Sequence, residues 1–444
     1  MRGPLAAAAL LWGQAAAAEP LLLISIDGLR PADVIEAEQR GLSLPNLRRF
    51  VREGAYATGV VGVLPTVTYP SHATLVTGAA PTRHGIVGNT TFDPMQINQG
   101  GWYWYASDYA LPTLWDAAKA AGRSTANVHW PVTVGETSID WNLPQVWRTG
   151  HADDAKLVAA LSTPGLVSEL ETATGGRYAP GIDESIEGDE TRGRFAAELI
   201  ARKRPFFITA YLTALDHEQH TKGPGSPEAH AILERIDAIV GRLVAAQRTA
   251  HPDGAVAVVS DHGFSTITTE VNFYRAFIDA GLIALGPDGK IARWDAAPWP
   301  AGGSVAVVLA REGDEALRAR VRTLLERLRA DPAMHIAAVA EPAEIARMGG
   351  NPQAAFYVEL KPDASAGGFA GGSAPASKPS GGKGAHGYFP AASFMRSTFM
   401  VMGPGIPAGR TLGEVDMRAI APTLATLLDV PLPSAELSAI QFTD

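Results

Sequence analysis

The stretch LLLISIDG, residues 21–28, decides the fold class of this 444-residue chain. A short apolar run that ends at a turn signal is typical of a central strand buried on both faces. Similar apolar runs occupy residues 206–212, 255–260 and 398–402. Because helical patterns lie between these runs, the sequence predicts an α/β fold with a mostly parallel sheet covered on both faces.

Residues typical of helix starts flank the helical patterns. Ser226 followed by Pro227 is a typical helix start, and apolar residues recur with a helical period as far as Val244. A second helix is expected from about Asp314, and a third over residues 417–428. These segments are long enough to form the outer layers of a three-layer α/β/α domain.

Three carboxylates follow predicted strands directly. Asp27, Asp216 and Asp261 each lie just past an apolar run. In open parallel sheets, ligands bind outside the carboxyl ends of the strands. The sequence therefore predicts a site at this edge of the sheet.

Composition excludes several classes of protein. The chain has no cysteine, which excludes disulfide scaffolds, cysteine-ligated zinc or iron–sulfur proteins and thiol nucleophiles. It is 46% hydrophobic and only 19% charged, unlike a disordered chain. A net charge of −9 argues against a stable nucleic-acid complex. A bound phosphate must therefore be neutralised locally, by a metal or a helix dipole.

The first residues resemble a secretory signal. Arg2 precedes an apolar run over residues 5–12, and Ala16 to Ala18 offer small residues for cleavage. The sequence thus predicts a signal peptide over residues 1–18 and a secreted or periplasmic protein, with an alanine-rich helix as the alternative. No stretch is apolar for long enough to cross a bilayer.

We expect a single α/β domain over residues 19–444 with an inserted subdomain at about 265–385. The insertion ends in a segment rich in Gly, Ser, Ala and Pro, residues 364–384. Such a composition predicts a flexible loop that cannot pack a core.

Without cysteine, a metal site must use Asp, Glu and His. Asp216 and His220 are four residues apart, so one helical turn can bring them to the same ion. Asp261 and His262 precede a glycine that permits a sharp turn. His386 is flanked by small residues. With Asp27 these residues make six ligands, which suit two zinc-like ions with three protein ligands each.

Thr68 is a candidate nucleophile. Pro70 and Gly78 predict the first turn and the end of a short helix, which places Thr68 near its N-terminus. The helix dipole there favours an anion, and a metal can activate a hydroxyl that is otherwise a poor nucleophile. The alternative is that Thr68 only caps the helix.

The ordered set of motifs resembles the nucleotide pyrophosphatase/phosphodiesterase family of the alkaline phosphatase superfamily. The resemblance extends over roughly residues 20 to 430. It rests on ISIDGLR at 24–30, TYPSH at 68–72, HGIVGN at 84–89, Asp216 to His220, SDHG at 260–263 and His386-Gly387.

The resemblance implies an alkaline phosphatase-like fold and two zinc ions. It implies that Thr68 forms a phospho-threonine intermediate and that Asn89 hydrogen-bonds a phosphate oxygen. The implied zinc ligands are Asp216, His220 and His386 for one ion, and Asp27, Asp261 and His262, next to Thr68, for the other. The segment has Gln219 where the family commonly has Gly, and Tyr69 where Phe is common; neither removes a ligand.

The expected activity is hydrolysis of phosphodiester or phosphoanhydride bonds in small molecules, with release of nucleoside 5′-monophosphates. The neutral Asn89 suits a diester better than a monoester. Tyr69 and the aromatic run 102–105 are candidates for stacking on a base, or alternatively for core packing. The alternatives are a phosphomonoesterase, a phosphonate hydrolase or a glycerophosphodiesterase on the same fold, and a non-catalytic binder of zinc or phosphate.

Overall fold

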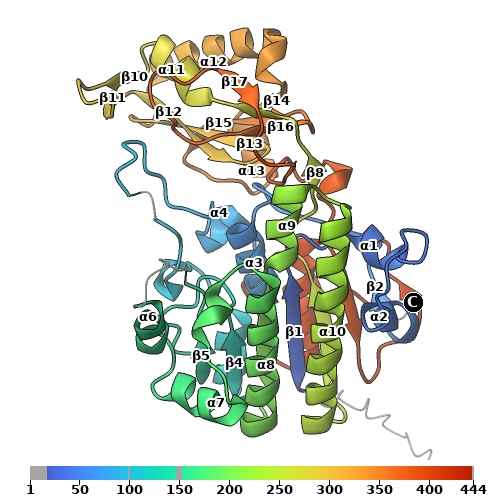
Figure 1. Cartoon of the computed structure of the whole chain (residues 1–444). Helices are drawn as coiled ribbons and strands as arrows, with labels where there is room; N and C mark the ends of the chain where they lie inside the picture. Colours follow the sequence, from blue (N-terminus) through green and yellow to red (C-terminus); the bar gives the residue numbers. More distant parts are fainter. Residues whose placement is uncertain (1–17, 99–100, 147–152, 443–444) are drawn as a thin grey trace, which may run out of the picture.

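A computed structural model describes residues 18–98, 101–146 and 153–442. It has a large α/β body and a smaller lobe above one end of the central sheet (Figure 1). Residues 1–17, which include most of the predicted signal peptide, lie outside the described part. No helix among the described residues has the length and apolar character needed to span a bilayer.

The central sheet has eight strands in the order β20-β2-β19-β7-β1-β6-β4-β5. From β7 to β5 all neighbours are parallel, whereas β19 runs antiparallel to both β7 and β2. This confirms a mostly parallel α/β sheet. The strands are β1 (Leu21–Ile26), β2 (Ala55–Tyr56), β4 (Thr125–Val128), β5 (Trp141–Leu143), β6 (Phe207–Leu212), β7 (Ala255–Val259), β19 (Phe399–Met402) and β20 (Arg410–Thr411).

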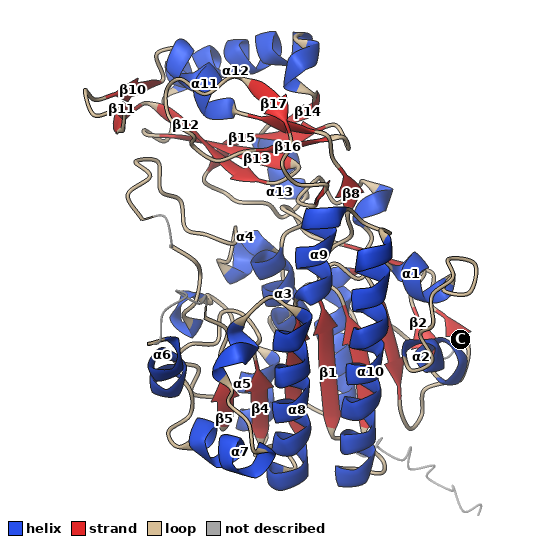
Figure 2. Cartoon of the chain, viewed as in Figure 1, coloured by secondary structure: helices blue, strands red, loops and turns tan. Residues whose placement is uncertain are grey.

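Both faces of the sheet are buried at its centre, which explains why β1, β6, β7 and β19 are largely apolar on both faces. Leu22 and Ile24 pack on one face, and Leu21 and Leu23 on the other. Helices cover each face (Figure 2). The first face is covered by α2 (Leu47–Glu53), α6 (Asp154–Leu161), α7 (Leu166–Thr174), α8 (Ile186–Lys203) and α10 (Pro227–Ala250), and the second by α3 (Thr68–Thr77), α5 (Leu114–Ala120) and α14 (Ile420–Leu428).

The predicted helix starts are confirmed. The Ser226 side chain accepts a hydrogen bond from the N–H of Ala229 at the start of α10. Asp314 accepts in the same way from Leu317 at the start of α12 (Glu315–Ala330). The C-terminal pattern forms a 3-10 turn, η5 (Met417–Ala419), followed by α14.

A second sheet forms the core of the smaller lobe. It has the order β12-β13-β15-β14, is antiparallel throughout and is buried against its own apolar cluster, which includes Phe273 and Phe356. The lobe lies between β7 and β19 in the chain, in the interval where the sequence predicts an insertion. Its elements are α11 (Phe273–Asp279), β10 (Ile283–Leu285), β11 (Ile291–Trp294), β12 (Ala296–Ala301), β13 (Ser304–Leu309), α12, η3 (Pro332–Met334), β14 (Ile336–Ala340), α13 (Pro342–Arg347) and β15 (Ala354–Leu360).

The expectation of a flexible loop over residues 364–384 needs one correction, because three short strands at its two ends are paired, while residues 367–376 between them form a loop. β16 (Ala364–Ala366) and β17 (Ser377–Pro379) pair with β9 (Thr269–Val271), and β18 (Gly384–Ala385) pairs with β8 (Ser265–Thr266). Backbone hydrogen bonds between strands hold both ends of this segment. The small side chain of Ala364 is buried in the apolar cluster of the lobe. The amino-acid composition of a segment does not predict backbone pairing of this kind.

The remaining short elements connect these layers. They are α1 (Pro31–Ile35), β3 (Gly59–Val61), α4 (Pro81–His84), η1 (Ala106–Asp108), η2 (Ala179–Ile182), α9 (Ala214–Lys222), η4 (Ser393–Met395) and β21 (Glu414–Asp416).

Candidate functional site

The three predicted carboxylates lie at the carboxyl ends of neighbouring strands. Asp27 follows β1, Asp216 is in the first turn of α9 just after β6, and Asp261 is two residues past β7. Because β7, β1 and β6 are adjacent and parallel, their ends meet at one edge. In Figure 1, α9 stands at this edge, beneath the smaller lobe.

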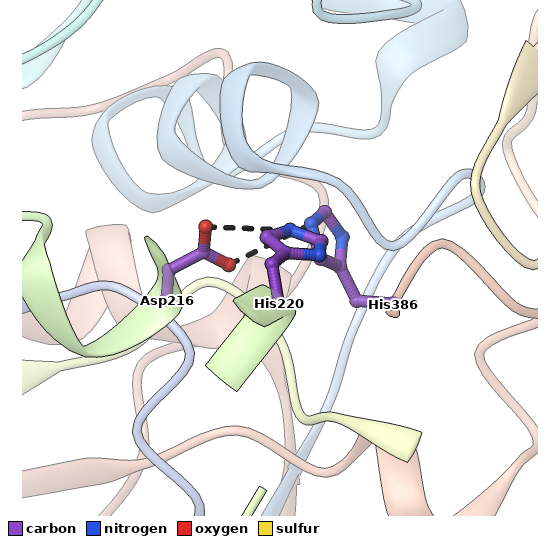
Figure 3. A group of neighbouring side chains, drawn as sticks. All are labelled: Asp216, His220 and His386. Carbon is purple, nitrogen blue, oxygen red and sulfur yellow. Dashed lines mark ion pairs between the residues drawn. The ribbon is translucent and has the colours of Figure 1, made fainter. Parts of the chain in front are cut away.

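One group of possible metal ligands is built on α9. Asp216 and His220 lie one helical turn apart, with 3.4 Å between Asp216 Oδ2 and His220 Nε2. His386, directly after β18, brings its Nε2 to 3.7 Å from Asp216 Oδ1. Figure 3 shows both imidazoles facing this carboxylate. The three residues can therefore hold one ion.

A second group is formed by Asp27, Asp216 and His262. His262 Nε2 is 3.4 Å from Asp27 Oδ1 and 3.1 Å from Asp261 Oδ2. Asp261, which the sequence predicts in this group, lies against it, and its Oδ1 accepts the N–H of Gly28 at 3.1 Å. Asp216 belongs to both groups, which its position in the sequence does not predict.

The three histidines present the same nitrogen to the cluster. Nδ1 of His220, His262 and His386 lies 3.0–3.2 Å from a backbone carbonyl oxygen, that of Gly384, Gly263 or Thr66 respectively. A neutral imidazole that donates from Nδ1 has its lone pair on Nε2. In each of the three, Nε2 is the atom close to a carboxylate oxygen of the cluster. This is the arrangement of metal-binding histidines whose orientation is fixed by a second hydrogen bond.

Several buried polar atoms of the two ligand groups have no hydrogen-bond partner. Among the described residues, Asp27 Oδ1, Asp216 Oδ1, Asp261 Oδ2 and His262 Nε2 are buried and accept or donate no hydrogen bond. Buried polar groups are normally satisfied, so four such atoms in one place need a partner. An oxygen- and nitrogen-only donor set of this kind fits zinc.

Burial and mutual repulsion set the charges of the cluster. Burial, together with the charges of Asp216 and Asp261, raises the pKa of Asp27 well above its usual range. Burial also raises the pKa of Asp216. Burial alone would lower the pKa of His262, but the adjacent Asp261 carboxylate raises it overall. Carboxylates packed this closely favour the binding of a cation.

Thr68 is the first residue of α3, and Val67 occupies the N-cap position without a side-chain bond. The alternative that Thr68 merely caps the helix is therefore not supported. The Thr68 carbonyl oxygen is 2.8 Å from His72 Nδ1, and His72 Nε2 is 2.9 Å from Ser25 Oγ on β1. These contacts fix the start of α3 against the strand that leads to Asp27.

Asn89 lies beside Thr68 and faces a cavity. Its Oδ1 accepts the N–H of Tyr69 at 2.9 Å, so its amide NH₂ is left as the donor. The cavity, called the central cavity below, has a volume of about 280 Å³. It is lined by Pro65, Val67, Val87, Gly88, Asn89, Thr90, His220, Trp299, Pro300, Ala301, Gly302, Ala306, Tyr357 and His386.

The aromatic candidates for stacking lie elsewhere. Tyr69 is only 1% exposed, packs edge-on against Trp102 and is not among the residues that line the central cavity. The neighbouring Tyr103 and Trp104 pack against the same small cluster. The structure therefore favours the packing alternative for these residues, and the aromatic wall of the cavity comes instead from Trp299 and Tyr357.

Two supporting elements had no signal in the sequence. The Tyr211 hydroxyl on β6 donates to Asp27 Oδ2, while Asp27 Oδ1 has no hydrogen-bond partner. Asp189 on α8 accepts the N–H groups of Thr213 and Ala214 at 2.9 and 3.0 Å and so caps α9 from another helix. Arg192 pairs with Asp189 and donates to Thr213 Oγ1 at 2.7 Å. This buried pair holds the helix that carries Asp216.

Removing the Asp189 carboxylate should destabilise the fold strongly. In Asp189→Ala the Arg192 guanidinium, 1% exposed, is left buried without its partner. We expect the free energy of unfolding to fall by about 3–5 kcal/mol, measured by chemical denaturation. Glu190→Ala on the same helix is the matched control, because Glu190 pairs with the exposed Arg235 and should cost at most about 1 kcal/mol. Equal losses in the two variants would contradict the role given to the buried pair.

Residues 21–366 match the model of a protein family, type I phosphodiesterase / nucleotide pyrophosphatase. The chain belongs to this family. The match contains every carboxylate of the cluster and Thr68, and it ends before His386.

Curated relatives match part of the chain. An uncharacterized pyrophosphatase/phosphodiesterase of Schizosaccharomyces pombe is 26% identical over 257 residues, which cover 55% of this chain and 44% of the relative. Ectonucleotide pyrophosphatase/phosphodiesterase family member 1 of Homo sapiens is 26% identical over 258 residues, covering 55% of this chain and 23% of the relative. The match therefore spans less than half the length of either relative.

Solved structures resemble the whole fold. Human ectonucleotide pyrophosphatase/phosphodiesterase 5 superposes with a TM-score of 0.65 at 18% identity, covering 96% of this chain and 98% of that one. An inactive threonine-to-alanine variant of the murine protein, solved in complex with AMP, matches equally well. At this identity the likeness establishes the alkaline phosphatase-like fold alone.

Proposed function

We propose that this protein is a zinc-dependent phosphodiesterase that hydrolyses nucleotide-type phosphodiester or phosphoanhydride bonds and releases nucleoside 5′-monophosphates. The observation that carries the proposal is the arrangement of two ligand groups that share Asp216, beside Thr68 and the Asn89 amide. Family membership and the AMP complex of the murine relative support the nucleotide assignment.

The ligand groups fit two zinc ions. Asp216, His220 and His386 would hold one, and Asp27, His262 and Asp261 would hold the other, with Thr68 as a further ligand and with Asp216 close enough to contribute to both. Bound zinc would supply positive charge that stabilises the attacking oxygen, the leaving oxygen and the phosphate between them.

The residues of the chain account for the remaining steps. In the proposed reaction, Thr68 Oγ1 gives its proton to water and attacks phosphorus, while the bond to the leaving oxygen breaks and that oxygen takes a proton from water. This gives a phospho-threonine, which water then hydrolyses to the monophosphate, regenerating the Thr68 hydroxyl. The Asn89 amide donates to a non-bridging oxygen of the phosphate. Tyr211 and Asp189 keep Asp27 and Asp216 in place throughout.

The charge of the site favours a diester over a monoester. Among the described residues that line the central cavity, none is a lysine or an arginine. A phosphodiester carries one negative charge at the reacting phosphate and a monoester carries up to two. A site that offers the neutral Asn89 amide and no lysine or arginine stabilises the second charge poorly. Phosphomonoesterase, phosphonate hydrolase and glycerophosphodiesterase activities are the alternatives to this assignment.

A comparison of aryl substrates tests the proposal. The zinc-loaded protein should hydrolyse bis(p-nitrophenyl) phosphate faster than p-nitrophenyl phosphate, measured by release of p-nitrophenol. A chelator should abolish both activities, and added zinc should restore them. A strong preference for the monoester would contradict the diesterase assignment, and full activity in the chelated protein would contradict the metal assignment.

We also propose that the protein acts outside the cytoplasm, in the periplasm or as a secreted protein. This rests on the predicted signal peptide over residues 1–18 and on the ectonucleotide enzymes among its relatives.

A further inference from the structure

A second cavity adjoins the central cavity. It has a volume of about 310 Å³ and shares Thr90, Trp299, Pro300 and Gly302 with its neighbour. We call it the polar cavity. Its other lining residues come from the loop after α4 and from the smaller lobe: Thr91, Phe92, Asp93, Gln96, Asn98, Tyr274, Pro298, Ala366 and Gly368.

The polar cavity offers hydrogen bonds from fixed groups. Asp93 Oδ2 accepts the N–H of Asn98 at 2.6 Å, which holds the carboxylate in place and leaves its other oxygen for a ligand. Gln96 Nε2 donates to the Tyr274 hydroxyl oxygen at 2.9 Å. Because that oxygen is already an acceptor, the Tyr274 proton is available to donate to a ligand. A carboxylate and a phenol can bond the hydroxyl groups of a polyol.

The charge of the polar cavity disfavours an anionic occupant. Asp93 is the only carboxylate among the described residues that line either cavity, and no lysine or arginine lines them. An anionic group in the polar cavity would therefore meet a negative charge with no cation to balance it. At a separation of a few ångströms near a protein surface, repulsion of this kind changes affinity by about tenfold or more.

The two cavities suit different chemical groups of a phosphodiester substrate. Val87, Trp299 and Tyr357 give the central cavity a largely apolar wall beside Asn89. The polar cavity shares Trp299 and Gly302 with it and is otherwise lined by polar side chains such as Asp93, Gln96 and Asn98. A phosphodiester has two esterified groups, so the flatter, more apolar group suits the central cavity and the more polar group suits the polar cavity.

We propose that the polar cavity binds the second esterified group of the substrate and selects an uncharged, hydroxyl-rich group, such as a nucleoside or glycerol, over a polyphosphate. This inference rests on the proposed phosphodiesterase activity. It narrows the substrates to diesters of two uncharged groups and makes nucleoside triphosphates poor substrates.

Two substrates that share one nucleoside 5′-phosphate test the inference. A dinucleoside monophosphate carries an uncharged second group, whereas a nucleoside triphosphate carries a diphosphate. The native protein should show the higher kcat/KM for the dinucleoside. Asp93→Lys should shift the ratio of the two kcat/KM values toward the triphosphate by at least about tenfold, with Asp93→Asn intermediate. The shift should shrink at high salt.

Asp288→Lys is the matched control. It makes the same change of charge on an exposed turn of the β10–β11 hairpin and lines neither cavity, so it should leave the ratio unchanged. An unchanged ratio in Asp93→Lys, or a native preference for the triphosphate, would overturn the inference. Faster turnover of a diester with a quaternary ammonium group than of the dinucleoside would also overturn it, in favour of a cationic occupant.

A third substrate separates this inference from the proposed function. Bis(p-nitrophenyl) phosphate has two neutral aryl groups and should be hydrolysed by the native protein and by all three variants. If the native protein does not hydrolyse it, the proposed phosphodiesterase activity itself is wrong. If it is hydrolysed while the Asp93→Lys ratio does not change, only the assignment of the polar cavity is wrong.

Discussion

Replacing Thr68 with alanine should lower kcat/KM for an aryl phosphodiester by at least about a thousandfold. The variant loses the hydroxyl of the proposed nucleophile, because alanine has none. The structure around it should persist, because His72 contacts the backbone carbonyl of residue 68 and not the side chain. The measurement is steady-state hydrolysis of bis(p-nitrophenyl) phosphate, together with zinc content and melting temperature.

Thr77→Ala on the last turn of the same helix is the matched control. Its hydroxyl donates to the Ala73 carbonyl at 2.8 Å, away from the ligand groups, so activity should be retained. Thr68→Ser keeps a hydroxyl and should retain part of the activity. If Thr68→Ala hydrolyses the diester at a near-normal rate with zinc bound, Thr68 is not the nucleophile.

Much of this site could be predicted because its residues are tied to the ends of strands. Asp27 and Asp261 follow apolar runs in the sequence, and parallel topology brings such ends together without further information. The spacing of Asp216 and His220 likewise predicts a shared face of one helical turn, which α9 provides. Local sequence patterns and one general rule of sheet topology are therefore sufficient to predict that these residues lie close together.

Other features depend on contacts that no local pattern encodes. Asp189 caps α9 by accepting the N–H of Thr213, which is 24 residues away in the sequence. Tyr211 donates a hydrogen bond to Asp27, which is 184 residues away. Tyr69 was a plausible stacking residue by position, but packing against Trp102 buries it. The ends of the segment 364–384 pair with β8 and β9, which its composition does not reveal. Tertiary packing decides each of these cases.

The position of Asp216 between the two ligand groups predicts that its loss is more severe than the loss of His220. Each oxygen of Asp216 lies close to a different histidine, Oδ2 to His220 and Oδ1 to His386, and the same residue completes the group with Asp27 and His262. Asp216→Asn keeps the size of the side chain but removes the negative charge that both groups use. We expect zinc content to fall at both sites and kcat/KM to drop by at least about a thousandfold.

His220→Ala should behave differently, because His220 belongs to one group only. Its zinc content should fall by one ion, and its activity, lowered by about ten- to a hundredfold, should recover in part when zinc is in excess. His217→Ala is the control on the same helix: His217 pairs with Glu184 at the surface and belongs to neither group. Zinc content by elemental analysis and kcat/KM across a zinc titration measure all three variants. If Asp216→Asn loses a single ion and is rescued by zinc as His220→Ala is, then Asp216 serves one ion, and the second is held by Asp27, Asp261 and His262 alone.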